Sequence, residues 1–255
     1  MDRSLGGAAS PIKNDECLVD RFDTYFQLVS ANSRELIEKA LALRYQVYCV
    51  ERQFEDPARQ HDGLESDQYD RHAVHSLIFH RPQAEVIGTA RLILPQARPN
   101  SLPIQQLLKE KGLNTADYFS NDSVAEISRF AISKEFRRRS GETGSSPGAA
   151  KREVHSNLPC LGLIQMLLRQ SAELGIDYWA AVMEPQLLRM LAAMGIRFDP
   201  VGPLVSYHGL RQPSYCHLPQ MLRNLALTRP DCWAVVTNNG ELMGAPVMAD
   251  LRRVA

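Results

Sequence analysis

The chain has 255 residues, 44% hydrophobic and 23% charged, a composition typical of a globular protein with one large domain or two small ones. Lys plus Arg and Asp plus Glu both number 29, so the overall charge gives no reason to expect a nucleic-acid partner. No segment approaches the roughly 18 apolar residues of a membrane span, and the amino terminus lacks the apolar core of a signal peptide. We therefore expect a cytoplasmic protein without an integral membrane segment.

The five cysteines are odd in number, widely spaced and without a Cys-x-x-Cys pair. A disulfide framework or a zinc site would need closer, paired spacing. We expect most of them to be plain buried thiols, and we expect no metal site.

The first 30 residues contain two expected segments. Residues 1–18 are rich in Gly, Ala, Ser and charge and are expected to form a flexible tail, and 21–30 are expected to form a strand. Asn32 and Glu35 then have the spacing of a capping box, and apolar residues at helical intervals predict a helix over about 33–50. Arg44 lies on the apolar stripe of this helix, which favours a buried partner over a solvated position.

A long polar connection follows at 53–70, and loops of this length are usually either mobile or functional. Glu65, Asp67 and Asp70 crowd together at its end. They form either a solvated acidic loop or, if buried arginines lie elsewhere, one side of a charge network. Strands at about 74–79 and 85–95 then read as an antiparallel hairpin, with Arg91 as a cation inside an apolar run, and 104–111 reads as a short helix.

The apolar run 124–133 contains Glu126, Ser128 and Arg129. An unpaired interior charge costs several kcal/mol, so partners must be close by. Strict alternation along a strand would point Glu126 and Arg129 to opposite faces, whereas a β-bulge between them would turn both toward one cleft. Two separate ion pairs at a strand edge are the alternative.

The carboxyl half begins with a basic insertion at 134–157, which is either merely solvated or binds an anion. A helix from Pro159 to Gly175, a strand at 177–184 and a helix at 185–194 follow. Two last strands at 201–208 and 214–218 and a helix at 219–228 complete the expected order.

Four segments, in this order and spacing, resemble the acyl-homoserine-lactone (autoinducer) synthases of the GNAT acyltransferase superfamily. They are Arg44, Tyr48 and Phe54; Glu65-Ser-Asp67-Gln-Tyr-Asp70; Gly88-Thr-Ala-Arg91-Leu; and Glu126-Ile-Ser128-Arg129-Phe130. Phe54 stands where that family has Trp, and the insertion is longer. The carboxyl half, with Ala181-Val-Met-Glu-Pro185, Tyr207-His-Gly209 and Arg211-Gln-Pro213, is more similar to N-acyl amino acid synthases and most similar to exosortase (PEP-CTERM) system-associated acyltransferases.

The resemblance implies an α+β, GNAT-like fold in which a central, mixed, mostly antiparallel twisted sheet is flanked by helices. It places the acyltransferase domain at 19–218, interrupted by the 134–157 insertion, and a carboxyl-terminal extension at 219–255 packed on that domain. In such folds the thioester arm lies in a splay between two central strands, here 124–133 and 177–184.

The implied reaction moves a fatty acyl group from a thioester to an amine in a ternary complex. It needs removal of a proton from the amine, stabilisation of an oxyanion and departure of a thiolate. Backbone N–H groups at a bulge near Ser128 to Phe130 would hold the carbonyl oxygen. Glu126 is either the base, acting directly or through water, or an ion-pair partner of Arg91 or Arg44 that shapes the pocket.

The resemblance thus gives catalytic roles to Glu126, Ser128 and Arg129. It gives substrate-binding roles to a larger set: Arg44, Tyr48, Phe54, Glu65, Asp67, Asp70, Arg91 and Phe130. We expect no tightly bound cofactor, with an acyl-phosphopantetheine thioester as co-substrate and a small amine or amino acid as acceptor.

The donor expected from the sequence is an acyl carrier protein. The glycine-rich GNAT signature for coenzyme A is missing at 137–144 and 158–162, whereas a basic cluster suits the acidic surface of a carrier protein; this cluster comprises Arg137, Arg138, Arg139, Lys151 and Arg152. Two other functions stay open: an autoinducer synthase that uses S-adenosylmethionine, and a non-catalytic acyl-group sensor. Acyl chain length, acceptor and oligomeric state are not specified by the sequence.

Overall fold

The computed structural model describes residues 17–97, 101–113, 119, 123–136, 157–207 and 209–242. The expected tail, apart from its last two residues, lies outside these ranges. So do the five basic residues assigned to carrier-protein binding, Arg137, Arg138, Arg139, Lys151 and Arg152.

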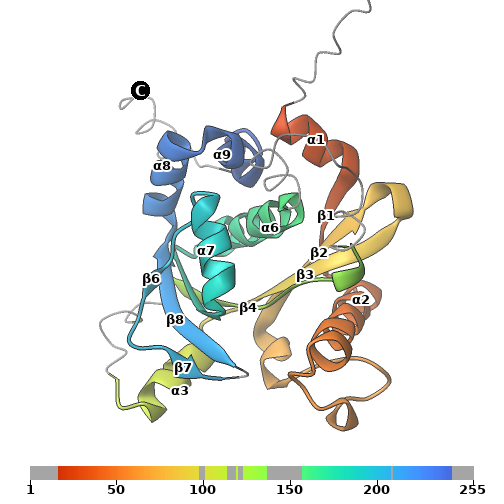
Figure 1. Cartoon of the computed structure of the whole chain (residues 1–255), viewed down its shortest axis with the longest axis vertical. Coiled ribbons are helices and arrows are strands. Elements are labelled where there is room, and N and C mark those ends of the chain that lie inside the picture. The colour runs from red at the N-terminus through yellow and green to blue at the C-terminus, as the bar shows by residue number, and fades with distance from the viewer. Residues whose placement is uncertain are drawn as a thin grey trace, which may run out of the picture.

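One open, twisted sheet runs through the described part of the chain in the order β1-β2-β3-β4-β5-β8-β6, and β7 pairs with β8 (Figure 1). Among the described strands, β4 and β5 alone pair in parallel, and the other pairs are antiparallel. The strands are β1 Phe26–Ser30, β2 Ala73–His80, β3 Glu85–Ile93, β4 Val124–Ile132, β5 Tyr178–Met183, β6 Asp199–Pro200, β7 Val205–Ser206 and β8 Leu210–His217. The sheet and its flanking helices confirm the expected fold class.

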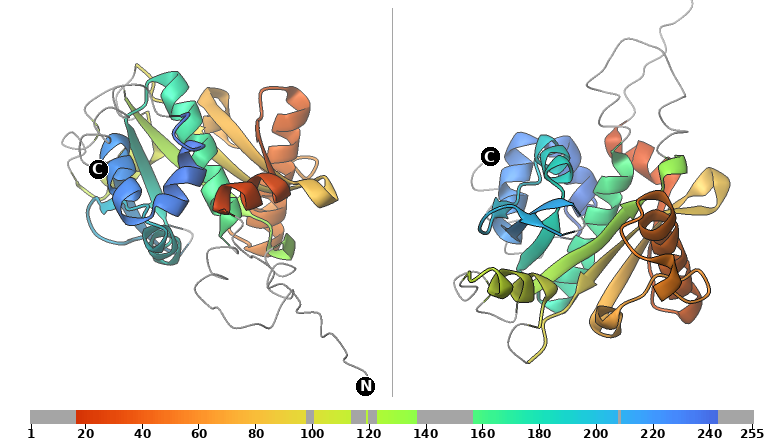
Figure 2. Two further views of the ribbon diagram at one scale, coloured as in Figure 1. Left: turned by 90° about the horizontal axis from the view of Figure 1, so that it is seen from above. Right: turned by 60° about the horizontal axis from the view of Figure 1, so that its bottom comes forward.

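Helices cover both faces of the sheet (Figure 2). They are α1 Leu18–Tyr25, α2 Arg34–Arg44, α3 Pro103–Glu110, α6 Leu158–Leu174, α7 Pro185–Ala193, α8 Leu218–Thr228 and α9 Pro230–Thr237. On β2, Leu77 packs in the cluster beneath α2, whereas its neighbour Ile78 packs in the main core with α6. Successive side chains of a strand point to opposite faces, so α2 and α6 lie on opposite sides of the sheet.

Helix α6 is the centre of the main core. Its side chains from Leu158 to Leu168 are buried without exception, and Trp179 of β5 donates a 2.8 Å hydrogen bond to Ser171 near the end of the helix. Gly162 permits a close approach, because a Cβ there would lie 2.7 Å from the Phe22 ring of α1. Helix α9 packs against both α6 and α1, with Cys232, Val235 and Val236 in the same core. The division of the chain at residue 218 stays a prediction.

Two expectations for the amino-terminal region need correction. Residues 18–25 form helix α1, and the strand begins only at Phe26. Val19 and Phe22, three residues apart, face the core together, so the helical period decides this segment. The following helix does run to residue 51, but its last part, Tyr45–Glu51, is a π-helix, and its N-cap is Ser33, whose hydroxyl accepts from Leu36 N, rather than Asn32.

Several elements agree with the expectation from the sequence pattern: the hairpin of β2 and β3, the short helix α3, and the order β4, α6, β5 and α7. The last strands differ in length from the expectation: the described residues 201–207 contain only the two-residue β7, and β8 begins at Leu210. None of the described helices is long and apolar enough to span a bilayer.

Candidate active site

The centre of the site is a β-bulge in β4. Thr89 of β3 faces Ala131 and Arg91 faces Ser128, so β4 has one residue more than β3 in this interval. Arg129 there adopts a φ of +50°, uncommon for a residue with a side chain. As a result Glu126, Ser128 and Arg129 all line one cavity, which strict alternation would not allow. The expected bulge is thereby confirmed.

The cavity follows a gap between β4 and β5. The two strands pair only as far as Ile127 and Ala181, although β4 continues to Ile132 and β5 to Met183. The cavity has a volume of about 1210 Å³, and the continuing parts of both strands line it. Its apolar lining includes Ile127, Ile132, Cys160, Val182, Leu187 and Met190. The splay expected from the resemblance is therefore present, and it has room for a fatty acyl chain.

Arg44 anchors the charged wall of the cavity from α2. Its side chain is fully buried, and its Nε donates to Glu65 Oε2 at 2.5 Å. Its Nη1 and Nη2 donate to the two carboxylate oxygens of Asp70, at 2.6 and 3.2 Å. The buried partner that the sequence pattern favoured is thus a pair of carboxylates from the loop 53–70.

Arg91 connects the same loop to the sheet. Its Nη1 donates to Asp67 and Asp70, both at 2.6 Å, and its Nη2 donates to Asp67 at 2.9 Å. Its Nε donates to the hydroxyl of Ser128, also at 2.9 Å. Ser128 therefore lies directly between the charge network and the bulge.

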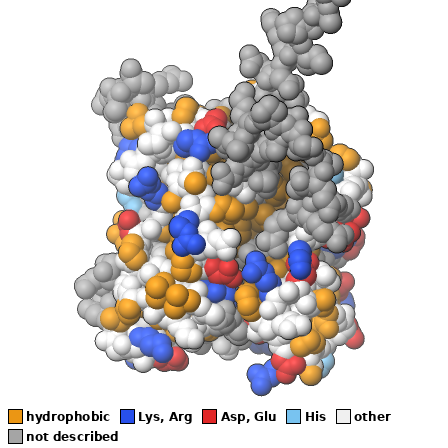
Figure 3. Space-filling view, in the orientation of Figure 1, with side chains coloured by type: hydrophobic (Ala, Val, Ile, Leu, Met, Phe, Trp, Pro, Cys, Tyr) orange, Lys and Arg blue, Asp and Glu red, His pale blue; other side chains and the backbone are white. Residues whose placement is uncertain are grey.

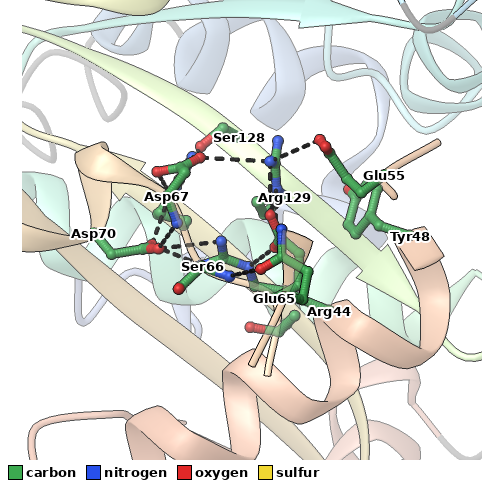
Figure 4. Close-up of polar contacts among 12 residues, drawn as sticks. Arg44, Tyr48, Glu55, Glu65, Ser66, Asp67, Asp70, Ser128 and Arg129 are labelled. Carbon is green, nitrogen blue, oxygen red and sulfur yellow. Dashed lines mark hydrogen bonds and ion pairs between the residues drawn. The ribbon is translucent and has the colours of Figure 1, made fainter. Parts of the chain in front are cut away.

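Arg129 completes the network from the bulge itself (Figure 4). It donates to Glu65 from Nη2 at 2.8 Å and to Glu55 at 3.0 Å. Its guanidinium lies 5.2 Å from the centroid of the Tyr48 ring, a cation–π contact, and the Tyr48 hydroxyl donates to Phe130 O at 3.4 Å. Three arginines from α2, β3 and β4 thus hold four carboxylates of one loop.

Local backbone contacts explain why the loop presents its carboxylates here. Asp67 and Asp70 form a capping box around the short 3₁₀ helix Gln68–His72, in which each side chain also accepts from a backbone N–H. Glu65 N donates to Leu41 O of α2 at 3.1 Å. Hydrogen bonds to backbone groups therefore fix both ends of the acidic segment independently of its ion pairs with the arginines.

The arginines keep these carboxylates ionised. Burial alone would raise the pKa of Glu65, but its hydrogen bonds and charge contacts with Arg129 and Arg44 hold that pKa below its usual range. For Asp70, burial is likewise outweighed by Arg44 and Arg91, and the pKa is low. His75 lies 3.7 Å from Asp70, and burial lowers its pKa to about 4, so it stays neutral at physiological pH.

Glu126 differs from the other carboxylates. Among the described residues it forms no ion pair with an arginine; its Oε2 accepts a 2.8 Å hydrogen bond from Ile104 N, in the first turn of α3. Burial raises the pKa of Glu126 to about 8, which that hydrogen bond and the charge of Arg91 only partly offset. The structure therefore does not show the alternative in which Glu126 pairs with Arg91 or Arg44, because both arginines bond to carboxylates of the loop.

A second ionic group at this cavity was not predicted from the sequence. Glu184, at the end of β5, lies 3.3 Å from Arg211 of β8 and 3.8 Å from Arg52, and both guanidinium groups lie over the ring of Phe54. Glu55 was also missed. These residues sit in loops or at strand ends, where no periodic pattern distinguishes them from solvated charges.

Comparisons with known proteins agree with this geometry. Residues 43–145 match the family model of the acetyltransferase (GNAT) domain. The fold is that of a GNAT-like acyltransferase. The acyl-homoserine-lactone synthase of Vibrio anguillarum is 25% identical over 169 residues, which cover 64% of this chain and 74% of that protein.

Two solved structures share the GNAT-like fold at lower identity. The N-acyl amino acid synthase FeeM from uncultured soil microbes is 16% identical, with a TM-score of 0.54 over 80% of this chain and 97% of that chain. The CoA-dependent acyl-homoserine lactone synthase BjaI is 19% identical, with a TM-score of 0.55 over 90% and 99%. The sequence match is thus to an acetyltransferase (GNAT) domain model, and the two solved structures share the fold of this chain.

Replacing Arg44 tests the charge network. Arg44→Met leaves Glu65 and Asp70 with one cation fewer in a buried site, so the free energy of unfolding, measured with urea, should fall by about 3–5 kcal/mol. Arg34→Met is the control, because the Arg34 side chain is 93% exposed and its pair with Glu38 contributes little. An Arg44→Met protein as stable as the control would contradict a network that fixes the loop.

Proposed function

We propose that this protein transfers a fatty acyl group from an acyl-carrier-protein thioester to the amine of an amino acid or a related small molecule. The observation that supports it best is the cavity through the β4–β5 gap, which joins an apolar channel to an ionic wall. A fatty chain suits the channel, and a small polar acceptor suits the wall. An acyl-group sensor would need only the channel.

The proposed step is direct attack in a ternary complex. The amine nitrogen forms a bond to the thioester carbon, the negative charge moves to the carbonyl oxygen, and backbone N–H groups of the bulge near Ser128 to Phe130 stabilise it. The carbon–sulfur bond then breaks, and the electron pair leaves with the thiolate of the phosphopantetheine. The carbonyl bond re-forms as sulfur leaves, the proton of the amine passes to Glu126 and from there to the thiolate, and the products are an amide and a free thiol.

Glu126 suits the role of base because its pKa is near 8. A base is most effective when its pKa lies close to the working pH, and an ordinary glutamate is too weak. Ser128 and Arg129 follow Glu126 on the same strand. The hydrogen bond from Arg91 Nε fixes the position of the Ser128 hydroxyl. Asp67, whose side chain is 26% exposed, offers a second acidic contact for the incoming amine.

The carrier protein as donor is proposed from the sequence alone, since its basic cluster lies outside the described residues. The similar synthase BjaI is CoA-dependent, so both donors belong in the assay. The likeness of the carboxyl half to exosortase-associated acyltransferases also stays a prediction.

The first experiment identifies the reaction. Purified protein is incubated with acyl-carrier-protein thioesters of several chain lengths and the twenty amino acids, and then with the same acyl groups on coenzyme A. We expect N-acyl amino acids by mass spectrometry and continuous release of free thiol, faster from the carrier protein. A stoichiometric acyl complex without thiol release would contradict an enzyme and support a sensor.

Autoinducer synthesis is the second candidate, favoured by the similarity to the Vibrio anguillarum synthase. That reaction would use S-adenosylmethionine as acceptor and would close a lactone. Adding S-adenosylmethionine to the same assay separates the two functions, because only a synthase yields an acyl-homoserine lactone.

The pH dependence tests Glu126. If Glu126 is the base, only its ionised form is active, so kcat/KM should rise with pH and level off above about 8. Glu126→Gln keeps an oxygen that can accept from Ile104 N, so α3 should stay in place. We expect kcat to fall by about 10²- to 10⁴-fold.

The acceptor amine also loses a proton as pH rises, so the comparison between variants is decisive. The control is Glu173→Gln on the exposed side of α6, which should behave as the unmodified protein. A Glu126→Gln protein with full activity and an unchanged pH profile would show that Glu126 only docks α3.

A further inference from the structure

The charged wall around the bulge carries an excess of negative charge. The cations are Arg44, Arg91 and Arg129, and the anions are Glu55, Glu65, Asp67 and Asp70, which leaves one net negative charge. Every guanidinium in this group already donates to at least two carboxylate oxygens. A carboxylate of the acceptor would meet like charges here, whereas an amine would be attracted.

The group formed by Arg52, Arg211 and Glu184 has the opposite balance. Two guanidinium groups share one carboxylate, at 3.8 and 3.3 Å, which leaves one net positive charge. All three side chains line the same cavity and keep access to solvent, with 40%, 11% and 30% of their surfaces exposed. In the view of Figure 3, basic and acidic side chains lie side by side near the centre of the molecule, next to a hydrophobic area.

The two groups adjoin each other. Phe54, whose ring lies 5.2 Å from the Arg211 guanidinium, is followed in the chain by Glu55, which accepts from Arg129. Consecutive Cα atoms are about 3.8 Å apart, and both residues line the cavity, so a positive and a negative wall meet at this peptide.

We propose that Arg211, assisted by Arg52, binds the carboxylate of the acceptor, so that the site selects a small zwitterion such as a free α-amino acid. This inference rests on the proposed acyl transfer to an amine and adds the residue that recognises the acceptor. A guanidinium binds a carboxylate through two parallel hydrogen bonds, and the guanidinium of Arg211 lies over the Phe54 ring, 5.2 Å from its centroid.

The bound zwitterion points its amine at the negative wall, toward Asp67, Ser128 and Glu126. Glu184 pairs with Arg211 and would compete with the incoming carboxylate. The phosphate of a thioester donor is a poorer occupant, because a long pantetheine arm separates it from the reacting carbon.

Binding is measured first, without turnover. Thermal stabilisation of the protein is recorded with each of the twenty L-amino acids and with the corresponding amino acid amides, which keep the amine but lack the carboxylate. We expect at least one free amino acid to stabilise the unmodified protein and its amide to have little effect.

Arg211→Met removes the charge and keeps an apolar contact with Phe54. Its Kd for the stabilising amino acid should rise about 10- to 100-fold, in line with a charged hydrogen bond. Glu184→Gln should lower the same Kd, because it removes the competitor. The control is Arg223→Ala, which should bind the amino acid as tightly as the unmodified protein. Among the described residues, Arg223 bonds only to a side chain of its own helix, α8.

The acyl-transfer assay gives the second readout. Arg211→Met should raise the acceptor KM for the free amino acid and leave that for the amide and for the thioester unchanged. The proposal is overturned if amides bind as well as acids, if no amino acid binds, if Glu184→Gln weakens binding, or if Arg211→Met raises the thioester KM instead. Carboxylate-dependent binding without any acylated product would contradict the proposed function and leave the role of Arg211 standing.

Discussion

The structure depends on the neutralisation of buried arginines from three separate elements by carboxylates of one loop. A guanidinium in an apolar sheet is costly unless it is fully paired, and the loop 53–70 supplies the pairs. The same contacts fix the position of the loop over the sheet and keep Asp67 and Glu65 ionised. The same ion pairs thus stabilise the fold and set the shape of the pocket, so a change in these ion pairs affects both.

The bulge in β4 converts this charged surface into a reaction site. It turns Arg129 toward the network, whereas Glu126 is buried without an arginine partner among the described residues and accepts from Ile104 N. Two carboxylate environments therefore lie side by side. In one, arginines lower the pKa; in the other, burial raises it. This contrast supports separate roles in binding and in proton transfer.

Much of this site could be predicted from the sequence, because charged residues interrupt apolar patterns where a partner is required. Arg44 on a helical stripe, Arg91 in a strand and Arg129 close to Glu126 are such cases. The ion-pair network joins the three arginines, and Glu126 lines the same cavity as Arg91 and Arg129. The partner of Glu126 could not be predicted, since a backbone N–H of α3 leaves no mark in the sequence. Residues 18–25 satisfy a helical period that the aromatic content of the segment obscured.

The group of Arg52, Arg211 and Glu184 could not be predicted from the sequence for another reason. Its members come from a loop and from the ends of two strands, and only the sheet order β4-β5-β8 brings them to the cavity. Topology also creates the gap, because the parallel pair of β4 and β5 separates beyond Ile127. Such features follow from the assembled sheet and not from local pattern.

The most direct test is a crystal structure with an acyl-pantetheine in which a methylene replaces the thioester sulfur, so that the ligand cannot react. The account predicts that the ligand passes between β4 and β5 beyond Ile127 and Ala181, with its carbonyl oxygen bonded to backbone N–H groups of the bulge. A ligand bound elsewhere, with the β4–β5 gap empty, would contradict the account.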